Sequence, residues 1–226
     1  MPLKNRYYKC SKISERKFRE IIRYFARDLT ASDTSRLTSI STRSINNIYL
    51  KLRKRILQVC EQHAPLKGVI EIDESYFGPH RIRGKRGRGA GGKTIVFGIF
   101  KRGDKVYTEI VPDASKASLV KVIRGHVSID SIIHTDGWRG YNGLVDVGFA
   151  KHFRVRHGEN EFAKDNQHIN GIESFWSYAK RRLVKFNGVP RINFLLHLKE
   201  TEFRFNHRNK NLYKVLLKLL RNEPLS

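Results

Sequence analysis

Residues 94–111 read TIVFGIFKRGDKVYTEIV, and this stretch decides the fold. Residues 94–100 and 106–111 are rich in β-branched and aromatic side chains, which favour strands. The segment RGD at 102–104 lies between them and is typical of a tight hairpin turn. Upstream, VIEID at residues 69–73 predicts another strand of the same kind. The sequence therefore predicts three consecutive strands of one sheet.

Helical and extended patterns alternate downstream of this stretch. A helix is expected over about 115–126, a fourth strand over 132–135, a fifth strand over 152–155, and helices over most of the remaining chain. This order predicts an α/β fold with a mixed sheet covered by helices. It resembles the order of the ribonuclease H-like fold, in which the first and fourth strands are neighbours in the sheet.

Residues 1–66 are predicted to be entirely helical. The first helix has an apolar face at helical spacing, formed by Phe18, Ile21, Ile22 and Phe25. A short helix is expected from about Ser32 to Leu37. After a turn, a further helix is expected from Ser41 or Thr42, because both residues are good N-caps. The apolar stripe of this last helix comprises Ile45, Ile48, Tyr49, Leu52 and Ile56.

The opposite side of that helix is polar and basic, with Arg43, Asn46, Asn47 and Lys54. A helix, a short turn and a second helix with such an outer face predict a helix-turn-helix domain over 1–66 that binds DNA through these four residues. An ordinary three-helix bundle with a solvated basic face fits the same pattern. Pro and Gly residues near 64–68 mark a boundary. A second domain, which includes the C-terminal helices, is therefore expected over 67–226.

Charge is the strongest signal in the composition. The 226 residues include 45 Lys and Arg against 21 Asp and Glu, a formal net charge of +24. This excess is spread over both halves and attracts polyanions, so double-stranded DNA is the expected partner. A membrane is not expected, because no apolar run approaches a bilayer span and no signal-peptide pattern opens the chain. These features predict a cytoplasmic, nucleoid-associated protein, or a nuclear one in a eukaryotic host.

Residues 81–93 (RIRGKRGRGAGGK) contain six basic residues and five glycines. Such a segment cannot bury apolar surface, so a mobile loop between two strands is expected. Its charge suits the phosphate backbone of DNA, which basic side chains neutralise without fixed geometry. The residues expected to make these contacts are Arg83, Lys85, Arg86, Arg88 and Lys93. A basic hairpin connection without DNA contact is the alternative.

Three acidic residues stand out by their positions. Asp73 lies inside the first predicted strand, where a carboxylate is costly unless a cation compensates it. Asp136 ends the fourth strand, so these two carboxylates are expected about 5 Å apart on neighbouring strands. Glu173 lies on the flank of the apolar stripe of a later helix and can face the sheet, with Lys180 two turns further on.

Two adjacent carboxylates with a third from a helix predict an oxygen-rich site for Mg²⁺ or Mn²⁺. Lys180 is expected to hold a phosphate near the ions. Each residue alone also has an ordinary interpretation, as a turn-forming Asp or a solvated Glu.

The segments around these carboxylates resemble the DDE transposases of small bacterial insertion sequences and the related eukaryotic Merlin-type elements. The resemblance covers roughly residues 67–210, and the spacing of 62 and 36 residues between the three carboxylates also suits this family. The matching segments are IDESYFG at 72–78, the basic loop ending at Lys93, TDGWRGY at 135–141, HINGIESFW at 168–176 and EFRFN at 202–206.

The resemblance implies that Asp73, Asp136 and Glu173 form the catalytic triad and bind two Mg²⁺ or Mn²⁺ ions per active site, with Lys180 beside them. It implies an enzyme that cuts the element ends and joins them to target DNA, as a homodimer or higher oligomer on DNA. Many relatives carry an N-terminal zinc ribbon with paired cysteines, which this chain cannot build. A nuclease that cuts without joining and a domesticated DNA-binding regulator without catalysis are the alternatives.

Three further residues in these motifs are candidates for DNA contact. Trp138 can stack on an unpaired base, and core packing beside the fourth strand is the alternative. His168 and Asn170 precede Glu173 in its motif, and a structural role fits His168 equally well.

Overall fold

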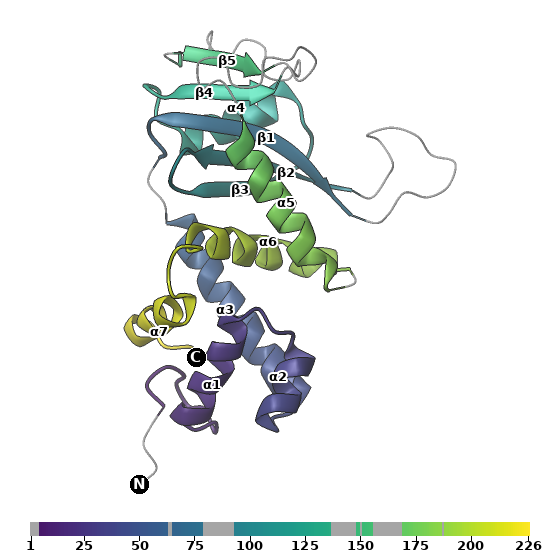
Figure 1. Cartoon of the computed structure of the whole chain (residues 1–226), viewed down its shortest axis with the longest axis vertical. Coiled ribbons are helices and arrows are strands. Elements are labelled where there is room, and N and C mark those ends of the chain that lie inside the picture. The colour runs from purple at the N-terminus through teal and green to yellow at the C-terminus, as the bar shows by residue number, and fades with distance from the viewer. Residues whose placement is uncertain are drawn as a thin grey trace, which may run out of the picture. The chain divides into compact units, whose positions relative to one another are not determined.

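The computed structural model describes residues 5–62, 65–78, 93–136, 148–149, 151–155, 169–186 and 188–226 (Figure 1). The chain forms two compact units, one of Met1–Glu61 with His207–Ser226 and the other of Gln62–Asn206. None of the helices in the described ranges is both long and apolar enough to cross a lipid bilayer.

The unit formed by the two ends of the chain is helical. The apolar faces predicted for its first and third helices are the buried ones, with Phe18, Ile21 and Ile45 fully enclosed. Ser14 and Thr30 cap the first two helices by accepting a backbone N–H of the first turn. The helices are α1 (Glu15–Ala26), α2 (Ala31–Thr38), α3 (Thr42–Glu61) and α7 (Leu212–Asn222).

Helix α7 lies in this unit, whereas the expected second domain included it. It packs against α1, and its Leu216 and Leu220 are fully buried. The phenol of Tyr213 accepts a hydrogen bond from Arg19, 194 positions earlier in the chain. The Pro and Gly residues near residue 66 are a local signal, so they could indicate a boundary at that point. They could not indicate that the C-terminal residues belong to the same unit as the N-terminal helices.

The unit of Gln62–Asn206 is built on a five-stranded mixed sheet in the order β3-β2-β1-β4-β5 (Figure 1). β1 is antiparallel to β2 and parallel to β4, which confirms that the first and fourth strands are neighbours. β1 extends beyond its predicted end because residues 74–77 pair with 94–97 of β2. The strands are β1 (Val69–Phe77), β2 (Thr94–Lys101), β3 (Val106–Val111), β4 (Ile132–Asp136) and β5 (Lys151–Val155).

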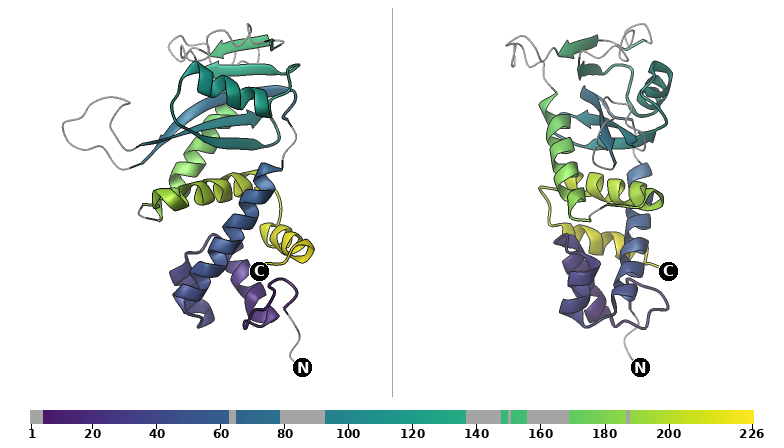
Figure 2. Two further views of the ribbon diagram at one scale, coloured as in Figure 1. Left: turned by 180° about the vertical axis from the view of Figure 1, so that it is seen from behind. Right: turned by 90° about the vertical axis from the view of Figure 1, so that its right-hand side faces the viewer.

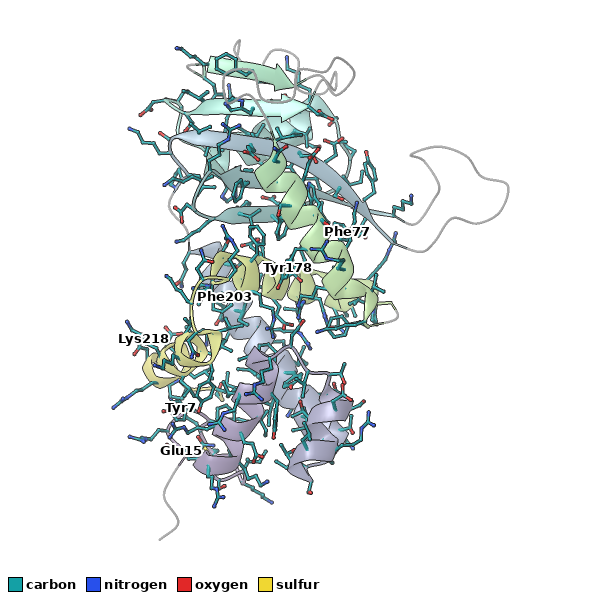
Figure 3. The ribbon with its side chains drawn as sticks, viewed as in Figure 1. Tyr7, Glu15, Phe77, Tyr178, Phe203 and Lys218 are labelled. Carbon is teal, nitrogen blue, oxygen red and sulfur yellow. The ribbon has the colours of Figure 1, made fainter. Side chains whose placement is uncertain are left out.

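Helices cover both faces of this sheet. α5 (Asn170–Val184) crosses one face and α4 (Lys116–His126) lies against the other, as the front and back views show (Figures 1 and 2). Successive side chains of a strand point to opposite faces, so each face has its own core. Ile70 and Ile72 of β1 pack in the core on the α4 side, whereas Phe77 packs on the α5 side (Figure 3).

Helix α6 (Arg191–Asn206) protects the open edge of the sheet. Among the strands that the structure describes, β3 lies at the edge, so the backbone groups on its outer side have no neighbouring strand there to bond with. Asn206 bonds with both the N–H and the carbonyl of the first residue of β3, each at 2.8 Å. Glu202 accepts the N–H of Thr108 at 2.8 Å, and Lys199 donates to the carbonyl of the same residue at 2.7 Å. Side chains of α6 thus make the hydrogen bonds to β3 that a neighbouring strand would otherwise make.

We expect Asn206→Leu to lower the free energy of unfolding by roughly 2–4 kcal/mol, because each backbone group left without a partner costs about 1–3 kcal/mol. Urea denaturation followed by circular dichroism measures this loss. Asn209→Leu, at an exposed position after the end of α6, is the matched control and should shift the value by no more than about 0.5 kcal/mol. Equal losses in both variants would contradict the edge-protecting role.

Candidate active site

Strand β1 directs acidic side chains toward α5. Ile70 and Ile72 point into the core on the α4 side. Successive side chains of a strand alternate, so Glu71 and Asp73 face α5. Glu71 is fully buried on that face, and Asp73 is half-buried. β1 therefore supplies two carboxylates to the side of the sheet that α5 covers.

Asp136 lies on the same face of the neighbouring strand. β1 and β4 are parallel with Ile72 opposite Thr135, so Asp73 and Asp136 are the next residues of the two strands. Neighbouring strands are about 4.8 Å apart, and both of these side chains alternate to the α5 side. The structure thus brings together the two carboxylates that the sequence placed on adjacent strands.

The carboxyl group of Asp73 is hard to ionise in this environment. Its pKa is raised from 3.8 to about 7, mainly by burial and then by the negative charges of Glu74 and Asp136. A buried carboxylate with acidic neighbours favours any change that removes the excess negative charge, by protonation or by a bound cation. The oxygen donors of this acidic pair therefore fit a divalent ion such as Mg²⁺ or Mn²⁺.

Glu173 and Lys180 come from α5. Glu173 is in the first turn, Lys180 lies two turns later, and both are exposed on the flank that the sequence predicted. In the described part of the chain, no three His, Cys, Asp or Glu side chains lie close enough together to hold one metal ion. The structure therefore pairs Asp73 with Asp136 and leaves Glu173 outside that pair.

Trp176 holds Asp73 from α5, a contact that the sequence analysis missed. Trp176 belongs to the apolar stripe of this helix; it is buried, and its indole N–H donates to Asp73 Oδ2 at 3.0 Å. Gly98 of β2 lies opposite Asp73, and a Cβ at Gly98 would be 2.6 Å from Trp176 Cζ2. Gly98 therefore allows the indole to approach the sheet. A glycine within a strand pattern is a known sign of such close approach and was the available signal.

Glu71 is the second residue that was missed. Its Oε2 accepts the backbone N–H of Ile172 in α5 at 3.0 Å, and its Oε1 accepts from Arg102 Nε at 2.7 Å. The available signal was its position two residues before Asp73, which places both on one face of the strand.

The remaining residues predicted to contact DNA fall into three groups. The four residues of α3, Arg43, Asn46, Asn47 and Lys54, are all exposed. Lys93 is half-buried just before β2, and Asn170 is exposed as the first residue of α5. The residues that lie outside the described ranges are Arg83, Lys85, Arg86, Arg88, Trp138 and His168.

Known transposase-related sequences match most of this chain. An uncharacterised transposase-like protein of Haemophilus influenzae is 45% identical over 118 residues, which cover 52% of this chain and 94% of that protein. An uncharacterised protein in transposable element ISH50 of Halobacterium salinarum is 28% identical over 193 residues. That match covers 77% of this chain and 65% of the Halobacterium protein.

Among solved structures, that of a pre-cleavage Mos1 transpososome is similar with a TM-score of 0.30 and 11% identity, covering 88% of this chain and 75% of that chain. This likeness is weak, and the family assignment does not depend on it. The model of the ISXO2-like transposase domain matches residues 65–206. That match extends over more than half of the chain and contains all three candidate carboxylates. The chain therefore belongs to the ISXO2-like transposase family.

Proposed function

We propose that the protein is an active transposase that cuts DNA at the ends of its insertion element and joins the freed ends to target DNA. The observation that carries this proposal is the pair of carboxylates at Asp73 and Asp136, side by side on the α5 face within a transposase domain. Burial, followed by the charges of Glu74 and Asp136, raises the pKa of Asp73, and a carboxylate held in such a place is an electrostatic cost to the fold, which favours a role in chemistry. Glu173 is the third member of the proposed triad.

The side chains have separable roles in this proposal. Asp73, Asp136 and Glu173 would hold two Mg²⁺ or Mn²⁺ ions, which when bound supply Lewis-acid chemistry for an in-line phosphoryl displacement. Trp176 fixes the orientation of the Asp73 carboxylate through its indole N–H. Lys180 lies on the flank of α5 that carries Glu173, where its charge suits a DNA phosphate.

We further propose that α1, α2 and α3 act as a helix-turn-helix that recognises the element ends. The buried side of α3 packs inside the unit, whereas Arg43, Asn47 and Lys54 are exposed on its other side. Exposed basic and amide side chains on the outer face of such a helix are suited to the major groove.

The basic loop at 81–93 is proposed to add contacts to the phosphate backbone, which its charge supports. We also propose that the protein acts on DNA as a homodimer or higher oligomer.

Replacement of Arg43, Asn47 and Lys54 by Ala is expected to reduce the preference for element ends over scrambled duplexes by at least about tenfold, because each base contact contributes about 1–3 kcal/mol. Fluorescence anisotropy with both duplexes measures this preference. The matched control replaces Lys214, Lys218 and Arg221, three exposed basic residues of α7 in the same unit. It should keep the preference, and an unchanged preference in the α3 variant would contradict the assignment.

One gel assay tests the proposed function against its alternatives. A labelled element-end duplex is incubated with the protein and target DNA in Mg²⁺, Mn²⁺, Ca²⁺ or no metal. A transposase gives cleaved and joined products, a nuclease gives cleaved products alone, and a regulator gives neither. Mg²⁺ or Mn²⁺ should be required, whereas Ca²⁺, which is larger and looser in coordination, should support little chemistry. The absence of joined products in both Mg²⁺ and Mn²⁺ would contradict the proposal.

A further inference from the structure

Glu71 is a buried carboxylate beside the candidate site that the proposed reaction does not use. Its side chain is fully buried and lies two residues before Asp73, so both are on the α5 face of β1. A buried carboxylate is costly unless it is hydrogen-bonded and paired, so its partners indicate its purpose.

The first partner of Glu71 is the N-terminus of α5. A helix usually has a Ser, Thr, Asp or Asn at the N-cap, whose side chain accepts the N–H of the second or third residue. The N-cap of α5 is Ile169, whose side chain makes no such bond. Glu71 accepts the N–H of the third residue, Ile172, at 3.0 Å. The strand therefore supplies the cap that the helix lacks, and its negative charge suits the positive end of the helix dipole.

The second partner is Arg102, in the turn between β2 and β3. Its Nε donates to Glu71 Oε1 at 2.7 Å, and only 17% of its side chain is exposed. Its backbone N–H also donates to the carbonyl of Val69 at 3.0 Å, which holds the turn against β1. One oxygen of Glu71 is thus bound to the turn between β2 and β3 and the other to α5, so this carboxylate of β1 links the sheet to the helix.

The start of α5 lies very close to the sheet at this link. A Cβ at Gly171 would be 2.1 Å from Phe100 Cε1 and 2.9 Å from Glu71 Oε2, so glycine alone fits between them. Glu173 follows two residues later in the same helical turn. A shift of the contact between Glu71 and the helix would therefore also move Glu173.

We propose that Glu71 is a positioning residue of the active site, which caps α5 from β1 and so sets the place of Glu173 relative to Asp73 and Asp136. This role rests on the proposed function, in which those three side chains hold the metal ions. Glu173 lies outside the acidic pair, so the distance from its carboxylate to that pair depends on where α5 begins. Mg²⁺ demands near-ideal octahedral geometry, and a displaced ligand therefore weakens its binding.

The test compares Glu71→Gln and Glu71→Met in the full-length protein. Gln keeps the shape and one carbonyl acceptor for the N–H of Ile172, whereas Met removes the acceptor. We expect Glu71→Met to weaken Mn²⁺ binding, titrated by electron paramagnetic resonance, by about 10–100-fold, as is usual for residues that orient metal ligands. Glu71→Gln should give an intermediate loss. In the metal-free Met variant, hydrogen exchange should be faster at 170–173 and unchanged in α4.

Glu202→Gln is the matched control for a merely structural effect. Glu202 is also fully buried, and it also accepts a backbone N–H and a cationic side chain, from Thr108 and Lys199, each at 2.8 Å. It should lower the melting temperature but leave Mn²⁺ affinity at the wild-type value.

Three outcomes would overturn the inference in distinguishable ways. If both Glu71 variants bind Mn²⁺ with wild-type affinity and Asp73→Asn does not, the positioning role is contradicted but the proposed metal site is not. Mn²⁺ binding that is the same in wild type and Asp73→Asn contradicts the proposed metal site, and the positioning role with it. Equal losses in Glu202→Gln and Glu71→Met would reduce the effect of Glu71 to general destabilisation.

Discussion

Asp73→Asn is expected to slow metal-dependent cleavage of a labelled element end by more than about 100-fold. Loss of a residue that only orients a metal ligand costs about 10–100-fold, so loss of a direct ligand should exceed that range. Asp136→Asn and Glu173→Gln should have effects of similar size, because each keeps the shape of the side chain and removes one charge. Single-turnover cleavage in Mg²⁺ measures the rate. Cleavage by all three variants at the wild-type rate would show that the triad is wrongly assigned.

The stability of the Asp73→Asn protein separates lost chemistry from lost folding. The pKa of Asp73 is raised from 3.8 to about 7, so the folded state holds this proton more tightly than the unfolded state. The metal-free wild-type protein therefore loses stability as the pH rises between these two values. Asparagine has no such titration. At pH 8 the metal-free Asp73→Asn protein should unfold at a higher urea concentration than wild type, and a lower midpoint would contradict this account.

Gly98→Ala is expected to lower the free energy of unfolding by about 1–3 kcal/mol and also to slow cleavage. The added Cβ would lie 2.6 Å from Trp176 Cζ2 and 2.8 Å from Ile172 Cδ1, so α5 must shift away from the sheet. That shift breaks the hydrogen bond from Trp176 to Asp73 and misplaces the carboxylate. The cleavage rate should fall by about 10–100-fold, as expected for a group that orients a ligand. Urea denaturation and the Mg²⁺ cleavage assay measure the two losses.

Gly125→Ala is the matched control. A Cβ at Gly125 in α4 would meet nothing within 4 Å, and alanine favours a helix by up to about 1 kcal/mol. This variant should be as stable as wild type or slightly more so, with unchanged cleavage. If Gly98→Ala cleaves as fast as Gly125→Ala, the contact between Trp176 and Asp73 has no part in the reaction.

The local patterns of the sequence predicted most of the elements correctly. The strands at 94–100 and 106–111 were recognisable because their β-branched residues flank a short turn, so the signal lies within one hairpin. The apolar stripes predicted for α1 and α3 matched their buried faces because this signal, too, lies within a single element. The proximity of Asp73 to Asp136 followed from the predicted strand ends together with the resemblance to the ribonuclease H-like fold, which implied that the first and fourth strands are neighbours.

The contacts that complete the candidate site could not be read from such patterns. Trp176 and Asp73 are 103 positions apart, and Glu71 and Ile172 are 101 positions apart, so neither pair shares a local motif. Tryptophan in an apolar stripe predicts core packing, and its N–H has no sequence signature that selects a partner. The position of Glu173 outside the acidic pair likewise depends on how close α5 comes to the sheet, and Gly98 and Gly171 leave the room for that approach.

The most direct test of the central claim is a Mn²⁺ titration, followed by electron paramagnetic resonance, of the protein bound to element-end DNA. Wild type should bind two ions per active site, because two carboxylates of the sheet and one of α5 act together with the DNA phosphates. Asp73→Asn, Asp136→Asn and Glu173→Gln should each lose at least one of these ions, with DNA binding retained. If all three variants bind Mn²⁺ with wild-type affinity and number, Asp73, Asp136 and Glu173 are not the metal site.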